Sequence, residues 1–138
     1  MVSLPSRTKA NATSRWDRVF AVLSAEPRRQ IVDELVDVSA GESIPLPEAV
    51  VDGSASSAAD RLRLRLCHHH LPLLEAEGVV HWESDPLRAY RGPNFEEVSV
   101  VLESLHANAT EIPDRLVIGC DSLEQERAGG HSKSGGNE

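Results

Sequence analysis

The segment that decides the fold runs from Arg61 to Glu75 and reads RLRLRLCHHHLPLLE. It holds three arginines, one cysteine and three consecutive histidines, and no Asp or Glu lies between Arg61 and Leu74. Drawn as a helix at about 100° per residue, the segment separates into distinct faces. The face expected to enter the core consists of Leu62, Leu66, His69 and Leu73. The face that carries basic side chains consists of Arg61, Arg65 and His68.

The flanking residues set the expected ends of this helix. Ser54 to Ala59 is a stretch of small residues that predicts a turn or loop. Asp60 then opens the helical segment, and Gly78 supplies the left-handed position at which helices often end. Pro72 lacks a backbone donor and is expected to disturb the helix. We therefore expect a helical segment over about residues 57–77 with an irregularity near Pro72.

Two shorter helices are predicted upstream. Ser14 and Asp17 fit a capping box, so the first helix is expected to begin at Ser14. Its apolar stripe consists of Trp16, Val19, Phe20 and Leu23. Pro27 is tolerated in the first turn of a second helix. The buried face of that second helix consists of Ile31, Val32, Leu35 and Val36. Residues 44–46 then predict an edge strand or extended link, and residues 48–51 predict one or two helical turns.

The periodicity changes after Gly78. Val79 to Glu83 favours a strand, and Arg88 to Arg91 favours a second strand after a turn around Pro86, so the two form a predicted hairpin. Asn94 is expected to cap a last helix. The apolar stripe of that helix consists of Val98, Val101, Leu102 and Leu105.

This order of elements is that of a winged helix-turn-helix domain, mainly α with a small β-hairpin as the wing. Residues 15–107 are expected to form that domain, after a flexible basic arm at residues 1–14. Residues 108–138 are expected to be a mostly disordered acidic tail. Within the tail, only residues 116–118 are apolar enough to be ordered, and residues 128–138 have the composition of a disordered segment.

The composition is that of one acidic domain. The 138 residues carry 22 acids against 14 Lys and Arg, for a net charge of −8. Only Lys9 and Lys133 are lysine, and this acidic, lysine-poor style resembles that of salt-accumulating archaea. With no signal peptide, no membrane-length apolar run and no paired cysteines, we expect a reduced cytoplasmic protein. No phosphate loop, nucleophile elbow or spaced acid pair suggests an enzyme, so none is expected.

Two motifs suggest a family. The residues from Leu23 to Ile31 resemble the Leu-x-x-x-x-Arg-Arg-x-Ile opening of ArsR-like repressors, with Arg28 and Arg29 as the arginine pair. The residues from His70 to Val80 resemble the His-Leu-x-x-Leu-x-x-x-Gly-Val-Val end of their recognition helix. With these two motifs and the histidine run before Leu-Pro, the chain most resembles a haloarchaeal family of ArsR-like domains. The resemblance covers roughly residues 15–106.

This resemblance implies a transcriptional regulator that binds double-stranded DNA as a homodimer through its first and last helices. The dimer residues would be Trp16, Phe20, Val98, Val101, Leu102 and Leu105. Sensors of the ArsR group carry paired cysteines or acid-histidine clusters, and this chain departs from them in having no such pair. We therefore expect no metal and no other cofactor, no membrane partner and no identifiable small-molecule substrate.

The predicted recognition helix, at about residues 57–77, would enter the major groove. Arg61, Arg65 and His68 would contact bases and phosphates there. Arg88 and Arg91 of the wing, at about residues 79–92, would contact the DNA backbone.

Other interpretations of the same segment remain open. The arginines can be a merely solvated face. Leu64 and Leu71, if exposed as one patch, would favour a winged-helix adaptor that binds a protein instead of DNA. Cys67 and His70, at i and i+3, could supply two ligands in a metal- or redox-responsive regulator. The three adjacent histidines diverge by about 100° each on a helix, so they cannot together bind one ion.

Overall fold

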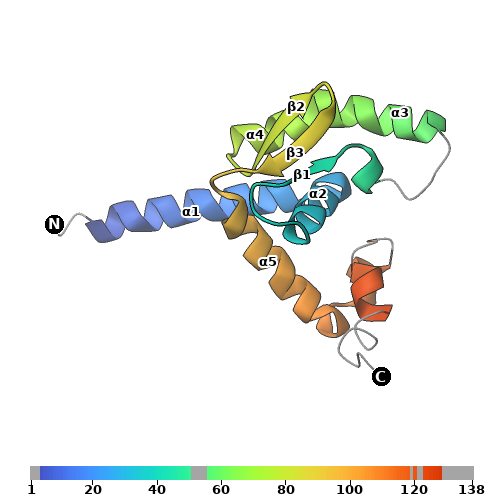
Figure 1. The fold of residues 1–138 in the computed structure, drawn as a ribbon. Helices are drawn as coiled ribbons and strands as arrows, with labels where there is room; N and C mark the ends of the chain where they lie inside the picture. The colour runs from blue at the N-terminus through green and yellow to red at the C-terminus, as the bar shows by residue number, and fades with distance from the viewer. Residues whose placement is uncertain (1–3, 51–55, 119, 121–122, 129–138) are drawn as a thin grey trace.

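A computed structural model describes the backbone of residues 4–50, 56–118, 120 and 123–128. Three of its helices, α1 (Leu4–Leu23), α2 (Glu26–Val36) and α5 (Phe95–Ala107), pack against one another. In Figure 1 a small sheet and a further helical segment lie above α1 and α2, while α5 runs down toward the C-terminal helices. The main apolar core lies where these elements meet and includes Val22, Ile31, Leu35, Leu66 and Leu102.

Helix α1 begins earlier than the sequence predicted. It starts at Leu4, so Ser14 lies inside the helix and the expected capping box is not its beginning. Between Ser6 and Glu26 the sequence has neither Gly nor Pro, and Pro5 sits in the first turn, where it is tolerated. Residues 4–14, expected to be a flexible arm, are therefore a helical extension of the domain. Helix α2 begins close to Pro27, as predicted.

The three strands form one antiparallel sheet in the order β1-β3-β2. Strand β1 (Ser43–Pro45) is the predicted edge strand, and β2 (Val80–Ser84) with β3 (Leu87–Arg91) is the predicted hairpin. Ala89 pairs with Ile44 on one side and with Trp82 on the other. The buried side chains of the sheet, which face the core, are Ile44, Val80, Leu87 and Ala89.

The segment around the histidines is one continuous helical rod, called the long helix below and comprising residues 56–76. It consists of α3 (Ser56–Arg65), a π-helical turn η2 (Leu66–His70) and α4 (Leu71–Ala76). It follows a single 3-10 turn, η1 (Glu48–Val50). The long helix begins at Ser56, inside the stretch expected to be a loop. Gly78 follows the long helix with φ +75°, which is the left-handed conformation predicted for the end of the helix.

The C-terminal region is more ordered than expected. Beyond α5, η3 (Ala109–Glu111), α6 (Asp114–Val117) and helical residues 123–128 surround a second, small core. Its buried members are Ala109, Val117, Cys120 and Leu123. The guanidinium of Arg127 donates to the carbonyls of Ala109 and Ile112 and pairs with Asp114. Residues 109–115 and 123–128 are therefore ordered although disorder was expected there, residues 116–118 are ordered as expected, and residues 129–138 lie outside the described part.

Candidate nucleic-acid interface

The first half of the long helix exposes its basic side chains. Arg61, Arg63, Arg65 and His68 are all exposed to solvent. None of the three guanidiniums makes a hydrogen bond or an ion pair with a residue that the structure describes, whereas Arg15, Arg18, Arg28 and Arg91 all do. The exposed arginines therefore keep their donors available to a partner molecule.

The inward face of the long helix differs from the predicted one after Leu66. Leu66 is buried as expected, but the buried histidine is His70, while His69 is exposed. Leu74 is fully buried in place of Leu73, which is only half-buried. The C-terminal half of the helix is thus rotated by one residue relative to a regular α-helix.

The π turn is the physical reason for this shift. The backbone N–H of Leu71 donates to the carbonyl of Leu66, five residues earlier, so the turn holds one residue more than an α turn. Pro72 follows at once, at the start of α4, where its missing N–H cannot bond to the carbonyl of His68. Leu71 is fully buried in this arrangement. The two-leucine patch that would have favoured an adaptor is therefore reduced to Leu64, which is 60% exposed.

A buried arginine joins the long helix to α1 and α2. Arg28 is 5% exposed, and its Nη1 lies 2.8 Å from Nδ1 of His70. The same guanidinium donates to the carbonyls of Val22 and Ala21, at 3.1 and 2.9 Å, and to the hydroxyl of Ser24 at 2.8 Å. Burial, followed by the neighbouring Arg28 cation, lowers the pKa of His70 from 6.5 to about 4. His70 is therefore neutral at pH 7.

Both arginines of the family-like motif serve the end of α1. Arg28 donates to two of its last carbonyls, and Nη1 of Arg29 donates to the carbonyl of Leu23 at 2.6 Å. Carbonyls at a helix C-terminus have no partner within the helix and carry partial negative charge, so cations are favoured there. The pair thus has a structural role that the sequence motif alone did not reveal.

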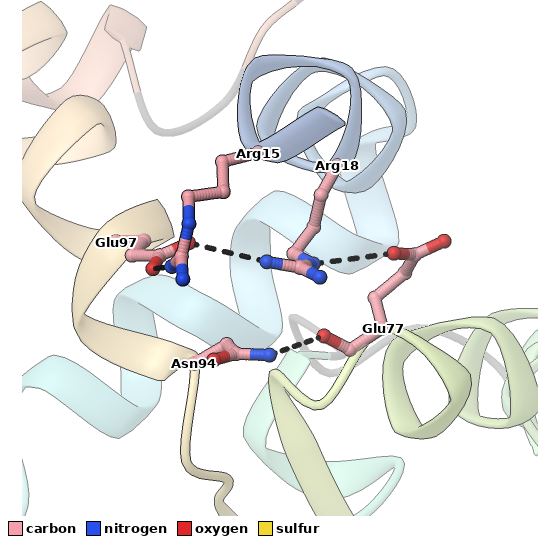
Figure 2. A network of polar contacts seen from close by, with 5 residues as sticks. All are labelled: Arg15, Arg18, Glu77, Asn94 and Glu97. Atoms are coloured by element: carbon pink, nitrogen blue, oxygen red, sulfur yellow. Dashed lines mark hydrogen bonds and ion pairs between the residues drawn. The ribbon is translucent and has the colours of Figure 1, made fainter. Parts of the chain in front are cut away.

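A second, more exposed arginine holds the far end of the long helix. Figure 2 shows Arg18 of α1 between Glu77, just after α4, and Glu97 in the first turn of α5. Its guanidinium lies 3.3 Å from a carboxylate oxygen of each. Arg15 also pairs with Glu97. Asn94 occupies the predicted cap position of α5, but its Nδ2 donates to the carbonyl of Glu77 at 3.0 Å and makes no cap bond to its own helix. The helix end is therefore tied to both α1 and α5.

The two arginines of the hairpin have different surroundings. Arg88 is half-buried and donates to the hydroxyl and carbonyl of Ser43 on β1. Arg91 donates to the carbonyls of Leu35, Val36 and Val38 at the end of α2, and it stacks over the ring of Phe95 at 5.0 Å. Since its guanidinium is used inside the protein, Arg91 is not part of the interface proposed below.

The expected dimer residues separate into two groups. Val98 and Leu102 are buried in the protomer core and Val101 is half-buried, so the first two are not available to a second copy. Trp16, Phe20 and Leu105 are exposed, by 52%, 63% and 40%. The rings of Trp16 and Phe20 stack at 5.6 Å.

An open groove of about 550 Å³ runs between α1 and α5 beside this exposed face. Its lining includes Trp16, Val19, Val100 and Val101. Val100 is 52% exposed and was missed from the sequence, because it lies just off the apolar stripe of α5.

Among the described residues, no group of three or more His, Cys, Asp or Glu side chains could hold a metal ion, and Nδ1 of His70 is taken by Arg28. No helix in the described ranges is long and apolar enough to cross a membrane. Comparisons with protein-family models, curated proteins and solved structures gave no match.

Proposed function

We propose that the chain is a winged helix-turn-helix regulator that binds double-stranded DNA, with the long helix in the major groove and the β2-β3 hairpin as the wing on the backbone. The observation that carries the proposal is the exposed group Arg61, Arg63 and Arg65, which has no partner among the described residues, in a protein of net charge −8. An acidic protein has many carboxylates to pair with arginines. Three guanidiniums left without one on a single helix favour an external polyanion.

The geometry of an α-helix suits this role. Arg61 and Arg65 are four residues apart and therefore lie on one face, about 6 Å apart along the axis. Arginine forks bind guanine edges and phosphate oxygens with two hydrogen bonds each. His68 extends the same exposed surface. Arg88 keeps Nη1 outside its bonds to Ser43, which leaves the two N–H groups of that nitrogen for a backbone phosphate.

The acidic total agrees with this function in a salt-rich environment. Counterion release favours basic proteins in dilute salt, but this contribution largely vanishes at molar salt. Recognition there depends on direct contacts and shape, which a local arginine surface can supply. The surrounding carboxylates then keep the rest of the surface hydrated.

The proposal includes a homodimer formed through α1 and α5. It is supported by the exposed stack of Trp16 and Phe20 next to Val100 and Leu105, since exposed apolar patches on soluble proteins often mark interfaces. The dimer residues differ from the expected set, because Val98 and Leu102 belong to the core.

The experiment is a selection of bound duplexes from a random DNA pool in molar KCl, followed by fluorescence anisotropy on the enriched sequence. We expect an inverted repeat whose half-sites lie about 34–36 Å apart, one per protomer. Arg61→Ala and Arg65→Ala should each weaken binding about tenfold or more. The control is Arg115→Ala on α6, which removes an equally exposed arginine far along the chain and should leave affinity unchanged.

Two outcomes would contradict the proposal. One is that no sequence is enriched at any salt concentration. The other is that Arg61→Ala and Arg65→Ala bind the enriched duplex as tightly as the Arg115→Ala control. Recovery of a protein partner through Leu64, with no enriched DNA, would decide for the adaptor instead.

A further inference from the structure

The contact between Arg28 and His70 fixes the chemical state of the histidine ring. An arginine guanidinium has five N–H donors and no acceptor. Since Nη1 of Arg28 lies 2.8 Å from Nδ1 of His70, Nδ1 must carry a lone pair and accept this bond. The ring is therefore neutral, with its proton on Nε2. A proton on Nδ1 would place two donors against each other, and a doubly protonated ring would also place two positive charges together in the core.

The position of this contact in the long helix matters more than its strength. His70 is the last residue of the π turn, and Arg28 reaches it from α2 while also holding the last carbonyls of α1. In a regular α-helix, His69 would occupy the inward position that His70 has here, and Leu73 would take that of Leu74. His69 and Leu73 would then be the more deeply buried side chains, and His70 and Leu74 would move away from the core.

We propose that Arg28 is a positioning residue, which holds the long helix in its π-shifted phase by donating to His70, and that protonation of His70 releases this hold. In the π-shifted phase it is His70, and not the exposed His69, whose ring nitrogen accepts from the buried guanidinium, so this bond stabilises the observed phase. The π turn thereby sets the directions in which the side chains of α4 point relative to the exposed arginines of α3. The consequence for DNA binding rests on the function proposed above, whereas the positioning itself does not.

The groups around His70 all oppose its protonation. The charged or titratable side chains that act on the ring are Arg28 from α2 and His69 and Arg65 from the long helix, and none of them is an acid. The end of α1 contributes backbone carbonyls and Ser24, just after it, contributes a hydroxyl, and these groups bind Arg28. The pKa of His70 is lowered to about 4 by burial first and by these cations second. No carboxylate in this set can compensate a charged His70.

The sign of the pH dependence follows. The unfolded chain binds a proton at His70 below about pH 6.5, and the folded chain does so only near pH 4. The stability contributed by neutral His70 is complete above pH 6.5 and is lost as the pH falls toward 4. Between pH 7.5 and pH 5 this should raise the unfolding equilibrium constant by about 30-fold.

The test uses the full chain without DNA. Urea unfolding is measured from pH 7.5 to pH 5 for the wild type, His70→Asn and His69→Asn. Asparagine at position 70 keeps an acceptor near the place of Nδ1 but does not titrate, so this variant should fold and should lack the 30-fold change. His69→Asn, which alters the exposed neighbour, should keep it. Ring ¹⁵N shifts of His70 should show the Nε2–H tautomer down to pH 5.

The phase of the helix is measured in the same samples by hydrogen exchange. The amide of Leu71 closes the π turn. After correction for the intrinsic pH dependence of exchange, its exchange rate at pH 4 should be at least tenfold higher than at pH 7.5. His70→Asn should abolish this acceleration. An unchanged pH slope in His70→Asn, an Nδ1–H tautomer, or an unaccelerated Leu71 amide would overturn the positioning role. If His70→Asn removes the pH slope but the wild-type protein binds no DNA, only the proposed function is refuted.

Discussion

Two arginines from the first two helices hold the long helix, and they do so by opposite physical means. Arg28 is almost fully buried and binds neutral acceptors: two carbonyls, a hydroxyl and a histidine nitrogen. Arg18 keeps 24% of its side chain exposed and pairs with two carboxylates, Glu77 and Glu97. The first contact lies at the π turn in the middle of the helix, and the second lies at its C-terminal end.

The difference shows how one residue type gives contacts of unlike strength and salt dependence. A buried guanidinium must have its donors satisfied, because an unpaired polar group away from water is costly. Salt does not screen such short, enclosed hydrogen bonds. An ion pair near the surface contributes little, and dissolved salt weakens it further. In molar salt the buried contact should therefore carry nearly all of the positioning.

The largest expected effect comes from removing the buried arginine. Arg28→Ala leaves the carbonyl of Val22 and Nδ1 of His70 without this donor, removes one of the donors to the carbonyl of Ala21, and opens a cavity. We expect a loss of about 3 kcal/mol or more in the free energy of unfolding, measured by urea denaturation. Arg63→Ala, an exposed arginine without a described partner, is the matched control and should stay within about 0.5 kcal/mol. Equal stabilities of the two variants would remove the distinction drawn above.

An intermediate effect is expected at the end of the long helix. Gly78 has φ +75°, and a Cβ there would lie 2.6 Å from Nδ2 of Asn94, which binds the carbonyl of Glu77. Gly78→Ala should therefore cost about 2 kcal/mol, from left-handed strain and the displaced asparagine. Gly41→Ala has a similar φ of +92° but nothing within 4 Å, so it should cost only the strain, about 1 kcal/mol. Thermal unfolding of the two variants separates these contributions, and identical losses would mean that Asn94 simply moves away.

The smallest effect is expected at the exposed arginine. Arg18→Ala removes both ion pairs and should cost about 0.5–1 kcal/mol in dilute buffer, falling toward zero in molar KCl because the charges are screened. Urea unfolding at the two salt concentrations measures this. A loss that persists undiminished in molar KCl would show that Arg18 acts through contacts that salt does not screen, as Arg28 does, and would make the two contacts physically alike.

The local patterns predicted most of the fold. Apolar spacing placed α2, α5 and the hairpin, and Gly78 marked the end of the long helix, because these features depend on nearby residues. Helix α1 was predicted too short, since an acceptable cap at Ser14 does not stop a helix that can continue upstream. The small core around Val117 was missed because its apolar residues are sparse and are brought together only by the chain's return.

The candidate site was predicted only in part. Exposure of Arg61, Arg65 and His68 follows from their face on a regular helix, and the structure agrees. The engagement of Arg91 with α2 could not be predicted, because it depends on how two distant elements pack. The sequence also assigned the buried position to His69 instead of His70. Periodicity assumes 3.6 residues per turn, and the π turn, set by Pro72 and the demands of Arg28, departs from it.

The π turn also has a consequence for comparing this sequence with others. A single π turn occupies the place of an α turn with one residue added. A related helix that lacked one residue between Leu66 and Leu71 would present the same inward side chains on both sides of the gap. An alignment of the two should therefore open a one-residue gap at Cys67 or His68, inside a helix, where gaps are normally forbidden. An alignment without that gap would match His69 to the buried position and place every later core residue one step out of register.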